Sequence, residues 1–313
     1  MASVLIALCL LAGFAALVTH ITWMRSVARD RVASGKVRIV VLNNVPYVSV
    51  VVHHNKINAL LDTGASNLSI NYDNYRNINL KEIESNTIIK SNDFVSYRVQ
   101  KISLGNSVLH YVYARIDMNN DLTWNELGLN VLKRASSVLF SYNDLLVNYR
   151  PNGISGCAKS NISSSLLIPI KVEGKASRAT FDSGLGVPML VISDGRPINS
   201  VKIPMLFARG MKSVQVSRGF ANIYTDYVDG RSINKGLKIE YISEDSNELS
   251  DYTGYQTPIV FGWPILRYFG IYVNFNNSEI CFLDRDTHSV IKNVSILTNT
   301  KVSSKSVLSY RSR

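Results

Sequence analysis

The chain has 313 residues, which is enough for one large domain or two domains of ordinary size. Hydrophobic residues make up 46% of it and charged residues 18%, a composition that excludes a disordered polyelectrolyte. Three cysteines exclude a disulfide-rich scaffold, and five histidines leave little material for a histidine-rich metal site. The formal net charge of +11 is compatible with a nucleic-acid or anionic membrane partner, and the positions of the basic residues distinguish the two.

An apolar segment opens the chain. Residues 2–24 contain no Asp, Glu, Lys or Arg, and at about 1.5 Å per residue a helix of this length crosses a hydrocarbon layer of about 30 Å. We expect residues 1–24 to form one uncleaved N-terminal transmembrane helix that contacts the membrane through residues 2–24. The alternative is a cleaved signal peptide and a secreted protein, but no basic residue precedes the apolar run.

Basic residues follow this segment and recur at the other end of the chain. Residues 25–38 form a basic juxtamembrane segment with five Lys or Arg and one Asp, and residues 287–313 form a basic, Ser-rich tail without an acidic residue. The positive-inside rule favours a single-pass membrane protein whose body lies on the cytoplasmic side. Because the basic clusters lie at the two ends, we expect no nucleic-acid partner.

The body between these ends has the pattern of a β protein. Short runs in which Val, Ile, Leu or Tyr alternate with polar residues predict strands, separated by Asn, Gly, Asp and Ser. The predicted strands include residues 45–52, 56–61, 98–105, 110–116, 166–172, 177–181, 236–242, 270–275 and 279–283. Two stretches are predicted to be helical: residues 124–137 and residues 262–269.

An internal repeat organises the body. Each half has a strand pair that leads into Asp-Thr-Gly (residues 62–64) or Asp-Ser-Gly (residues 182–184), followed by an apolar strand. Later in each half come a glycine element, at Gly128 and Gly262, a short helix and a closing hairpin. We therefore expect two lobes, joined by a linker at residues 152–165. Their expected bounds are residues 39–155 and residues 156–286.

The two repeated aspartates suit acid–base chemistry. A pseudo-two-fold axis would bring the carboxylates of Asp62 and Asp182 face to face, and like charges at such a distance share one proton. One carboxylate can then take a proton from water while the other protonates a carbonyl oxygen, so an amide is hydrolysed without a metal or a cofactor. A single motif of this kind is usually a turn in which Asp caps its own backbone. Two copies in matched contexts favour the catalytic interpretation.

These motifs resemble those of the aspartic proteases of the pepsin and retropepsin superfamily. LLDTGASNLSI (residues 60–70) carries the likeness in the first half. FDSGLGVPMLVI (residues 181–192) and IVFGWPILRYFGIYVNFNNSEICFL (residues 259–283) carry it in the second. The resemblance covers roughly residues 39–286. It implies an all-β, bilobal pepsin-like acid-protease fold with a pseudo-two-fold axis, a peptide cleft between the lobes and a hairpin flap above the cleft.

The resemblance also implies roles for single residues. Asp62 and Asp182 match the catalytic pair, and the residues that support the active-site loops are Thr63, Gly64, Ser183 and Gly184. The hydroxyls of Thr63 and Ser183 match those that interlock the two loops. The flap is expected at Ser91, Asn92 and Asp93. The family uses no metal or other cofactor, its partner is a peptide or protein substrate, and a two-lobed chain acts as a monomer.

Two residues depart from the family's pattern. Ala65 and Leu185 stand where pepsin-like enzymes usually carry Ser or Thr, whose hydroxyl donates to the catalytic carboxylate. The sequence predicts a membrane-tethered aspartic endopeptidase. The alternative is a catalytically inactive relative that binds peptides or has a structural role in a membrane, and Leu185 and the absence of a flap Tyr-Gly pair favour it. Whether Cys157 and Cys281 are free or paired stays open at this point.

Overall fold

The computed structural model describes residues 35–71, 74, 80–118, 124–149, 157–162, 164–173, 175–193, 200–207, 210–228, 231–245 and 257–284. The expected membrane segment (residues 1–24) and basic tail (residues 287–313) lie outside these ranges, and so do residues 25–34 of the juxtamembrane segment. Within the described ranges, no helix has the length and apolar character needed to cross a membrane.

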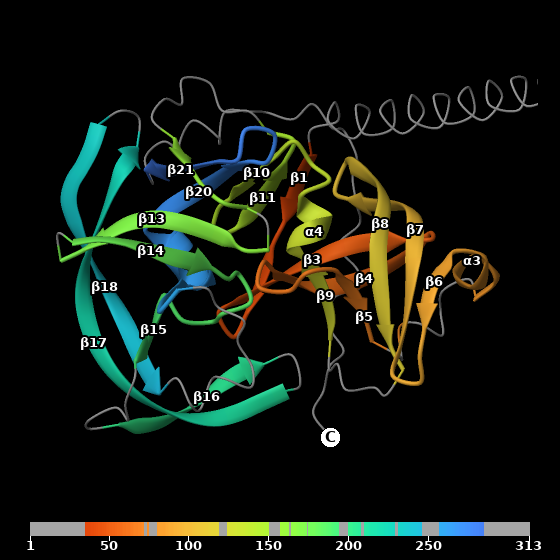
Figure 1. The fold of residues 1–313 in the computed structure, drawn as a ribbon, viewed down its shortest axis with the longest axis horizontal. Coiled ribbons are helices and arrows are strands. Elements are labelled where there is room, and N and C mark those ends of the chain that lie inside the picture. Colours follow the sequence, from red (N-terminus) through yellow and green to blue (C-terminus); the bar gives the residue numbers. More distant parts are fainter. Residues whose placement is uncertain are drawn as a thin grey trace, which may run out of the picture.

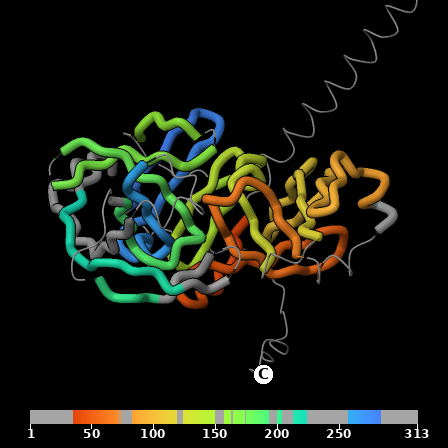
Figure 2. Tube along the Cα trace, turned by 60° about the horizontal axis from the view of Figure 1, so that its bottom comes forward, coloured from red at the N-terminus to blue at the C-terminus, as the bar shows by residue number. Residues whose placement is uncertain are grey.

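The described part of the chain is all-β, and its strands form three sheets. Figure 1 shows an eight-stranded sheet in red to yellow, a seven-stranded sheet in green to cyan, and strands of a six-stranded sheet between them. The first two sheets belong to the N-terminal and C-terminal lobes, which also lie side by side in the turned view of Figure 2.

The eight-stranded sheet makes up most of the N-terminal lobe. Its order is β2 (Val40–Leu42), β3 (Val45–Val52), β4 (Asn55–Asp62), β9 (Asn125–Gly128), β5 (Leu68–Ile70), β8 (Ser107–Asp117), β7 (Phe94–Leu104) and β6 (Thr87–Lys90). A further pairing between β3 and β7 makes the sheet curl upon itself. Side chains in β3 alternate between buried and half-buried positions, as expected for a strand with one face in a core.

The seven-stranded sheet repeats this plan in the C-terminal lobe. Its order is β13 (Leu166–Val172), β14 (Lys175–Phe181), β19 (Ile259–Phe261), β15 (Met189–Ser193), β18 (Arg231–Asp245), β17 (Gly210–Val228) and β16 (Val201–Phe207). In both lobes, a short strand lies between the two strands that flank the Asp loop. β9 is parallel to β4 and antiparallel to β5, just as β19 is parallel to β14 and antiparallel to β15.

The six-stranded sheet takes strands from both halves of the chain. Its order is β1 (Gly35–Arg38), β11 (Asp144–Val147), β10 (Ser137–Phe140), β20 (Phe269–Asn274), β21 (Glu279–Asp284) and β12 (Ala158–Lys159). The antiparallel pair β10–β20 joins the two halves, and a disulfide between Cys157 and Cys281 links the start of the second half to β21.

One hydrophobic core extends under both lobes and supports the Asp loops. Leu61 and Phe181, which directly precede Asp62 and Asp182, are fully buried members of the same cluster. The Phe181 ring packs edge-on against Phe140 of the shared sheet, with 5.3 Å between ring centroids. The two loops therefore start from fixed points of a common core.

Several boundaries differ from those the sequence predicts. Residues 125–128, expected to be helical, form β9 because β4 and β5 pair with them on both sides, and only α4 (Leu129–Leu132) is helical there. Residues 262–269 contain only the 3₁₀-helix η1 (Trp263–Arg267). Residues 35–38, placed in the juxtamembrane segment, form β1 because Gly35 and Val37 are buried against the sheet. Helix α3 (Leu80–Ser85) was not predicted.

Candidate active site

The two aspartates lie at matching places in the two lobes. Asp62 ends β4, and Asp182 directly follows β14. The loop after each aspartate is held by the element that follows the short central strand. The N–H of Leu129 donates to the carbonyl of Ala65 at 2.8 Å, and the N–H of Trp263 donates to the carbonyl of Leu185 at 2.9 Å. The internal repeat of the sequence thus appears in the structure as a pseudo-symmetric pair of loops.

Buried hydrogen bonds lock the two loops together. The Thr63 N–H donates to Ser183 Oγ at 2.9 Å, and the Ser183 N–H donates to Thr63 Oγ1 at the same distance. Each hydroxyl then donates across the lobe boundary, Thr63 to the carbonyl of Phe181 at 2.8 Å and Ser183 to the carbonyl of Leu61 at 2.7 Å. Both side chains are fully buried. The relative position of the aspartates is therefore fixed by four bonds between the lobes.

Each aspartate lies against the glycine of the opposite loop. A Cβ atom added at Gly64 would lie 2.6 Å from Asp182 Oδ2, and one added at Gly184 would lie 2.7 Å from Asp62 Oδ2. These separations are shorter than van der Waals contact, so a side chain at either glycine would have to displace a carboxylate. The glycines allow the two carboxyl groups to approach each other closely.

Backbone donors orient both carboxyl groups. Asp62 Oδ1 accepts the N–H of Gly64 at 2.8 Å and the N–H of Ala65 at 3.1 Å. Asp182 Oδ1 accepts the N–H of Gly184 at 2.9 Å. Such donors favour the ionised form of a carboxyl group and hold its free oxygen in a fixed direction.

The pair is arranged to retain a proton. Burial raises the pKa of Asp62 well above its usual range, and the Asp182 carboxylate and Glu126 raise it further. The backbone hydrogen bond from Ala65 lowers the same pKa but does not outweigh them. A hydrogen bond between the two aspartate side chains also contributes. One proton shared by two carboxyl groups is the protonation state that acid–base hydrolysis requires.

The two residues that depart from the pattern of pepsin-like enzymes, Ala65 and Leu185, have different surroundings. Ala65 supplies its backbone N–H to Asp62, but it offers no hydroxyl. Leu185 is 6% exposed and packs with Leu190 and Val260 in an apolar cluster of the C-terminal lobe. Leu185 is thus part of the packing that supports the second loop.

The structure brings together six of the nine expected site residues. These are Asp62, Thr63 and Gly64 of the first loop and Asp182, Ser183 and Gly184 of the second. The expected flap residues Ser91, Asn92 and Asp93 form the exposed tip of the hairpin between β6 and β7, at the edge of the eight-stranded sheet. Ser91 Oγ closes this turn by accepting the N–H of Phe94 at 3.1 Å.

Glu126 also belongs to the site, although it was not predicted from the sequence. It is 6% exposed, lies in β9 and interacts electrostatically with Asp62 and Asp182. Burial raises its pKa to about 7. A signal was present in the sequence, because Asn-Glu-Leu-Gly in the first half matches Ile-Val-Phe-Gly in the second, with an acid in place of Val260.

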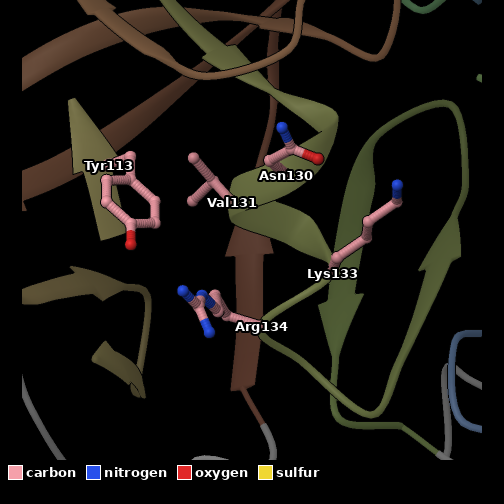
Figure 3. Close-up of a pocket in the computed structure, with 5 residues that line it drawn as sticks. All are labelled: Tyr113, Asn130, Val131, Lys133 and Arg134. Carbon is pink, nitrogen blue, oxygen red and sulfur yellow. The ribbon is translucent and has the colours of Figure 1, made fainter. Parts of the chain in front are cut away.

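A separate cavity lies beside α4. It has a volume of about 300 Å³ and is lined by Tyr113, Asn130, Val131, Lys133 and Arg134 (Figure 3). Arg134 is already engaged, since it donates to the carbonyl of Tyr111 at 2.9 Å. Within the described residues, no group of three or more His, Cys, Asp or Glu side chains is arranged to hold a metal ion.

Comparison with known proteins identifies the fold. No family model matches the chain, and a search of curated proteins finds no match. Among solved structures, the chain is similar to the aspartic proteinase from Irpex lacteus, with a TM-score of 0.50 and 12% identity over 80% of this chain and 97% of that one. It is also similar to a retropepsin-like aspartic protease from Rickettsia conorii, with a TM-score of 0.31 and 17% identity over 37% of this chain and 90% of that one. The first likeness confirms the aspartic protease fold to which the motifs point.

Proposed function

We propose that this chain is an aspartic endopeptidase, which hydrolyses peptide bonds with a water molecule activated between Asp62 and Asp182. The observation that supports the proposal most directly is the reciprocal hydrogen bonding between the two Asp loops. It places each aspartate against the glycine of the other loop and holds both carboxyl groups in one shared environment. A merely structural turn would need neither the close approach nor a raised pKa at Asp62.

The chemistry follows from the protonation state of the pair. Asp62 holds the shared proton and donates it to the carbonyl oxygen of the substrate, while Asp182 takes a proton from water as the water oxygen bonds to the carbonyl carbon. In the tetrahedral diol that results, one hydroxyl returns a proton to Asp62 and the nitrogen takes the proton from Asp182. The C–N bond then breaks, and the pair is left with one proton, as at the start.

Substitution of either aspartate tests this activity. We expect Asp62→Asn and Asp182→Asn each to lower the kcat for peptide cleavage by about 10²–10⁴, since Asn has the shape of Asp but cannot exchange the proton. The measurement is cleavage of a peptide library by the purified full chain in detergent, with the unfolding midpoint as a check on folding. Near-normal turnover in either variant would refute the proposal.

We further propose that residues 1–24 tether this peptidase to a membrane as a single-pass helix. The length and apolar character of residues 2–24 support the tether. The disulfide between Cys157 and Cys281 supports a body in an oxidising compartment, because cytosolic thiols are kept reduced. This orientation is opposite to the one that the basic residues 25–38 favour, and the disulfide carries more weight because it lies within the folded body itself.

A further inference from the structure

Glu126 lies on the same face of the sheet as Asp62. In the parallel pair of β4 and β9, Leu60 is opposite Glu126 and Asp62 is opposite Gly128. Side chains two residues apart on a strand point to the same face, and the strand spacing and rise put the Cα atoms of Glu126 and Asp62 about 8 Å apart. The exposed fraction of Glu126 is 6% and that of Asp182 is 7%, so the two residues are buried to a similar extent.

Groups from three neighbouring strands and from the second Asp loop act on Glu126. After burial itself, the largest influences on its pKa are a hydrogen bond with the Ser69 side chain of β5 and the charges of Asp182 and Arg115. Asp62 at the end of β4 also repels it. The Arg115 guanidinium of β8 lies over the Phe94 ring, 4.3 Å from its centroid.

No cation of the described part of the chain pairs with the Glu126 carboxylate. Lys36 and Lys159 are engaged elsewhere, in ion pairs with the partly exposed Asp144 and Glu279. A buried carboxylate without an ion-pair partner destabilises the folded state unless a cation or several donors satisfy it. Glu126 therefore offers a negative site to a cation that enters from outside the chain.

The matching place in the other lobe is apolar. Val260 precedes Phe261-Gly262 as Glu126 precedes Leu127-Gly128, and each lies on the strand between those that flank an Asp loop. Val260 is fully buried and packs with Leu185 and Leu190. The pseudo-symmetric site is thus charged on one side of the aspartate pair and apolar on the other.

We propose that Glu126 is a specificity-determining residue, which selects peptide substrates that carry a lysine or arginine side chain beside the scissile bond. This inference rests on the proposed peptidase activity. A peptide held at Asp62 and Asp182 places side chains on the face that carries Glu126, where a cationic side chain gains an ion pair. An acidic side chain would instead add a further negative charge to three carboxyl groups. The apolar side around Val260 suits an uncharged residue at the other side of the bond.

Two otherwise identical peptides test the selection, one with lysine and one with norleucine next to the scissile bond. Norleucine keeps the aliphatic chain but lacks the charge. For the full chain in detergent, we expect kcat/KM to be about 10-fold or more higher for the lysine peptide, as for other hydrogen bonds to charged groups. In Glu126→Gln, the ratio should fall to about 1, whereas Glu84→Gln, the same change at an exposed position of α3, should leave it intact. Equal rates for the two peptides in the unaltered chain would overturn the inference, as would a ratio that survives in Glu126→Gln.

A binding measurement separates this inference from the peptidase proposal. The same two sequences, made as uncleavable hydroxyethylene analogues, are titrated into the full chain by calorimetry. Tighter binding of the lysine analogue, lost in Glu126→Gln, would support the inference by a readout independent of turnover. If both analogues bind equally, selection by Glu126 fails while the peptidase proposal stands. If neither binds and neither peptide is cleaved, both fail.

The pH dependence provides a second signature. Because the pKa of Glu126 is about 7 without substrate, the lysine preference should increase between pH 5 and pH 8 as this group ionises. Asp62, Asp182 and Arg115 are the other charged groups that act on Glu126, so the Glu126→Gln profile serves as the baseline. A preference in the unaltered chain that does not change with pH would contradict an ionised Glu126 as its cause.

Discussion

Glu126 lowers the stability of the protein when it is ionised. Its pKa is 4.5 in an ordinary environment and about 7 in the folded protein, mainly because burial disfavours the charge. The folded protein therefore binds this proton more tightly than the unfolded chain. With respect to this group, stability is greatest below about pH 4.5 and falls as the pH rises through about 7.

The substitution Glu126→Gln should remove this dependence of stability on pH. Between pH 4.5 and 8, the free energy of unfolding of Glu126→Gln should rise relative to the unaltered chain by about 3 kcal/mol, which is most of the free energy that corresponds to the raised pKa of Glu126. Urea unfolding at a series of pH values measures the difference, and the exposed Glu84→Gln should show no such trend. A difference that stays constant over this range would show that Glu126 does not titrate abnormally in the folded protein.

The interlocked loops form the element on which the site depends. Thr63 donates to one backbone carbonyl and accepts one backbone N–H across the lobe boundary. Thr63→Val keeps the shape but leaves both backbone groups buried without this partner. We expect it to lower the free energy of unfolding by about 2–4 kcal/mol and to reduce kcat as the aspartates lose their fixed separation.

Two matched variants isolate this effect. Thr63→Ser retains the hydroxyl and should keep most of the stability. Thr87→Val removes an exposed hydroxyl that donates to the carbonyl of Ile83 at 2.8 Å, and it should cost no more than about 1 kcal/mol. Chemical unfolding of the three variants gives the comparison. A Thr63→Val variant as stable as Thr87→Val would mean that the bonds between the lobes contribute little.

Local sequence was sufficient to predict the two Asp loops but not to predict the strand β9. The repeated Asp-Thr/Ser-Gly motif, each copy between apolar strands, predicts the site because its turn chemistry is local. Apolar residues in 124–137 recur at helical spacing, so the sequence predicts a helix there. Asn125–Gly128 instead form the strand β9, because they pair with β4 and β5. Glu126 was missed for the same reason: its place beside Asp62 exists only once β9 lies next to β4.

The boundaries of the lobes also depend on contacts that are distant in sequence. Strands from both halves share the six-stranded sheet, so the linker of an internal repeat does not mark where one lobe stops. Residues 35–38 carry two of the basic side chains that suggested a membrane flank, yet Val37 between them is buried. Basic residues are therefore a poor indication of a membrane-facing segment where they occupy the exposed positions of a strand whose side chains alternate between buried and exposed.

At the scale of the whole molecule, the basic flank and the disulfide favour opposite sides of a membrane for the body. If the body lies in an oxidising compartment, as we propose, Cys157 and Cys281 should remain unlabelled by a thiol reagent under denaturing conditions until a reductant is added. In sealed vesicles with the cytoplasmic face outward, the body should also resist added protease until detergent opens the membrane. Alkaline carbonate extraction should leave the chain in the membrane if residues 2–24 act as a tether. Direct labelling of both cysteines together with digestion of the body in sealed vesicles would instead place it in the cytoplasm, on the side that the positive-inside rule favours.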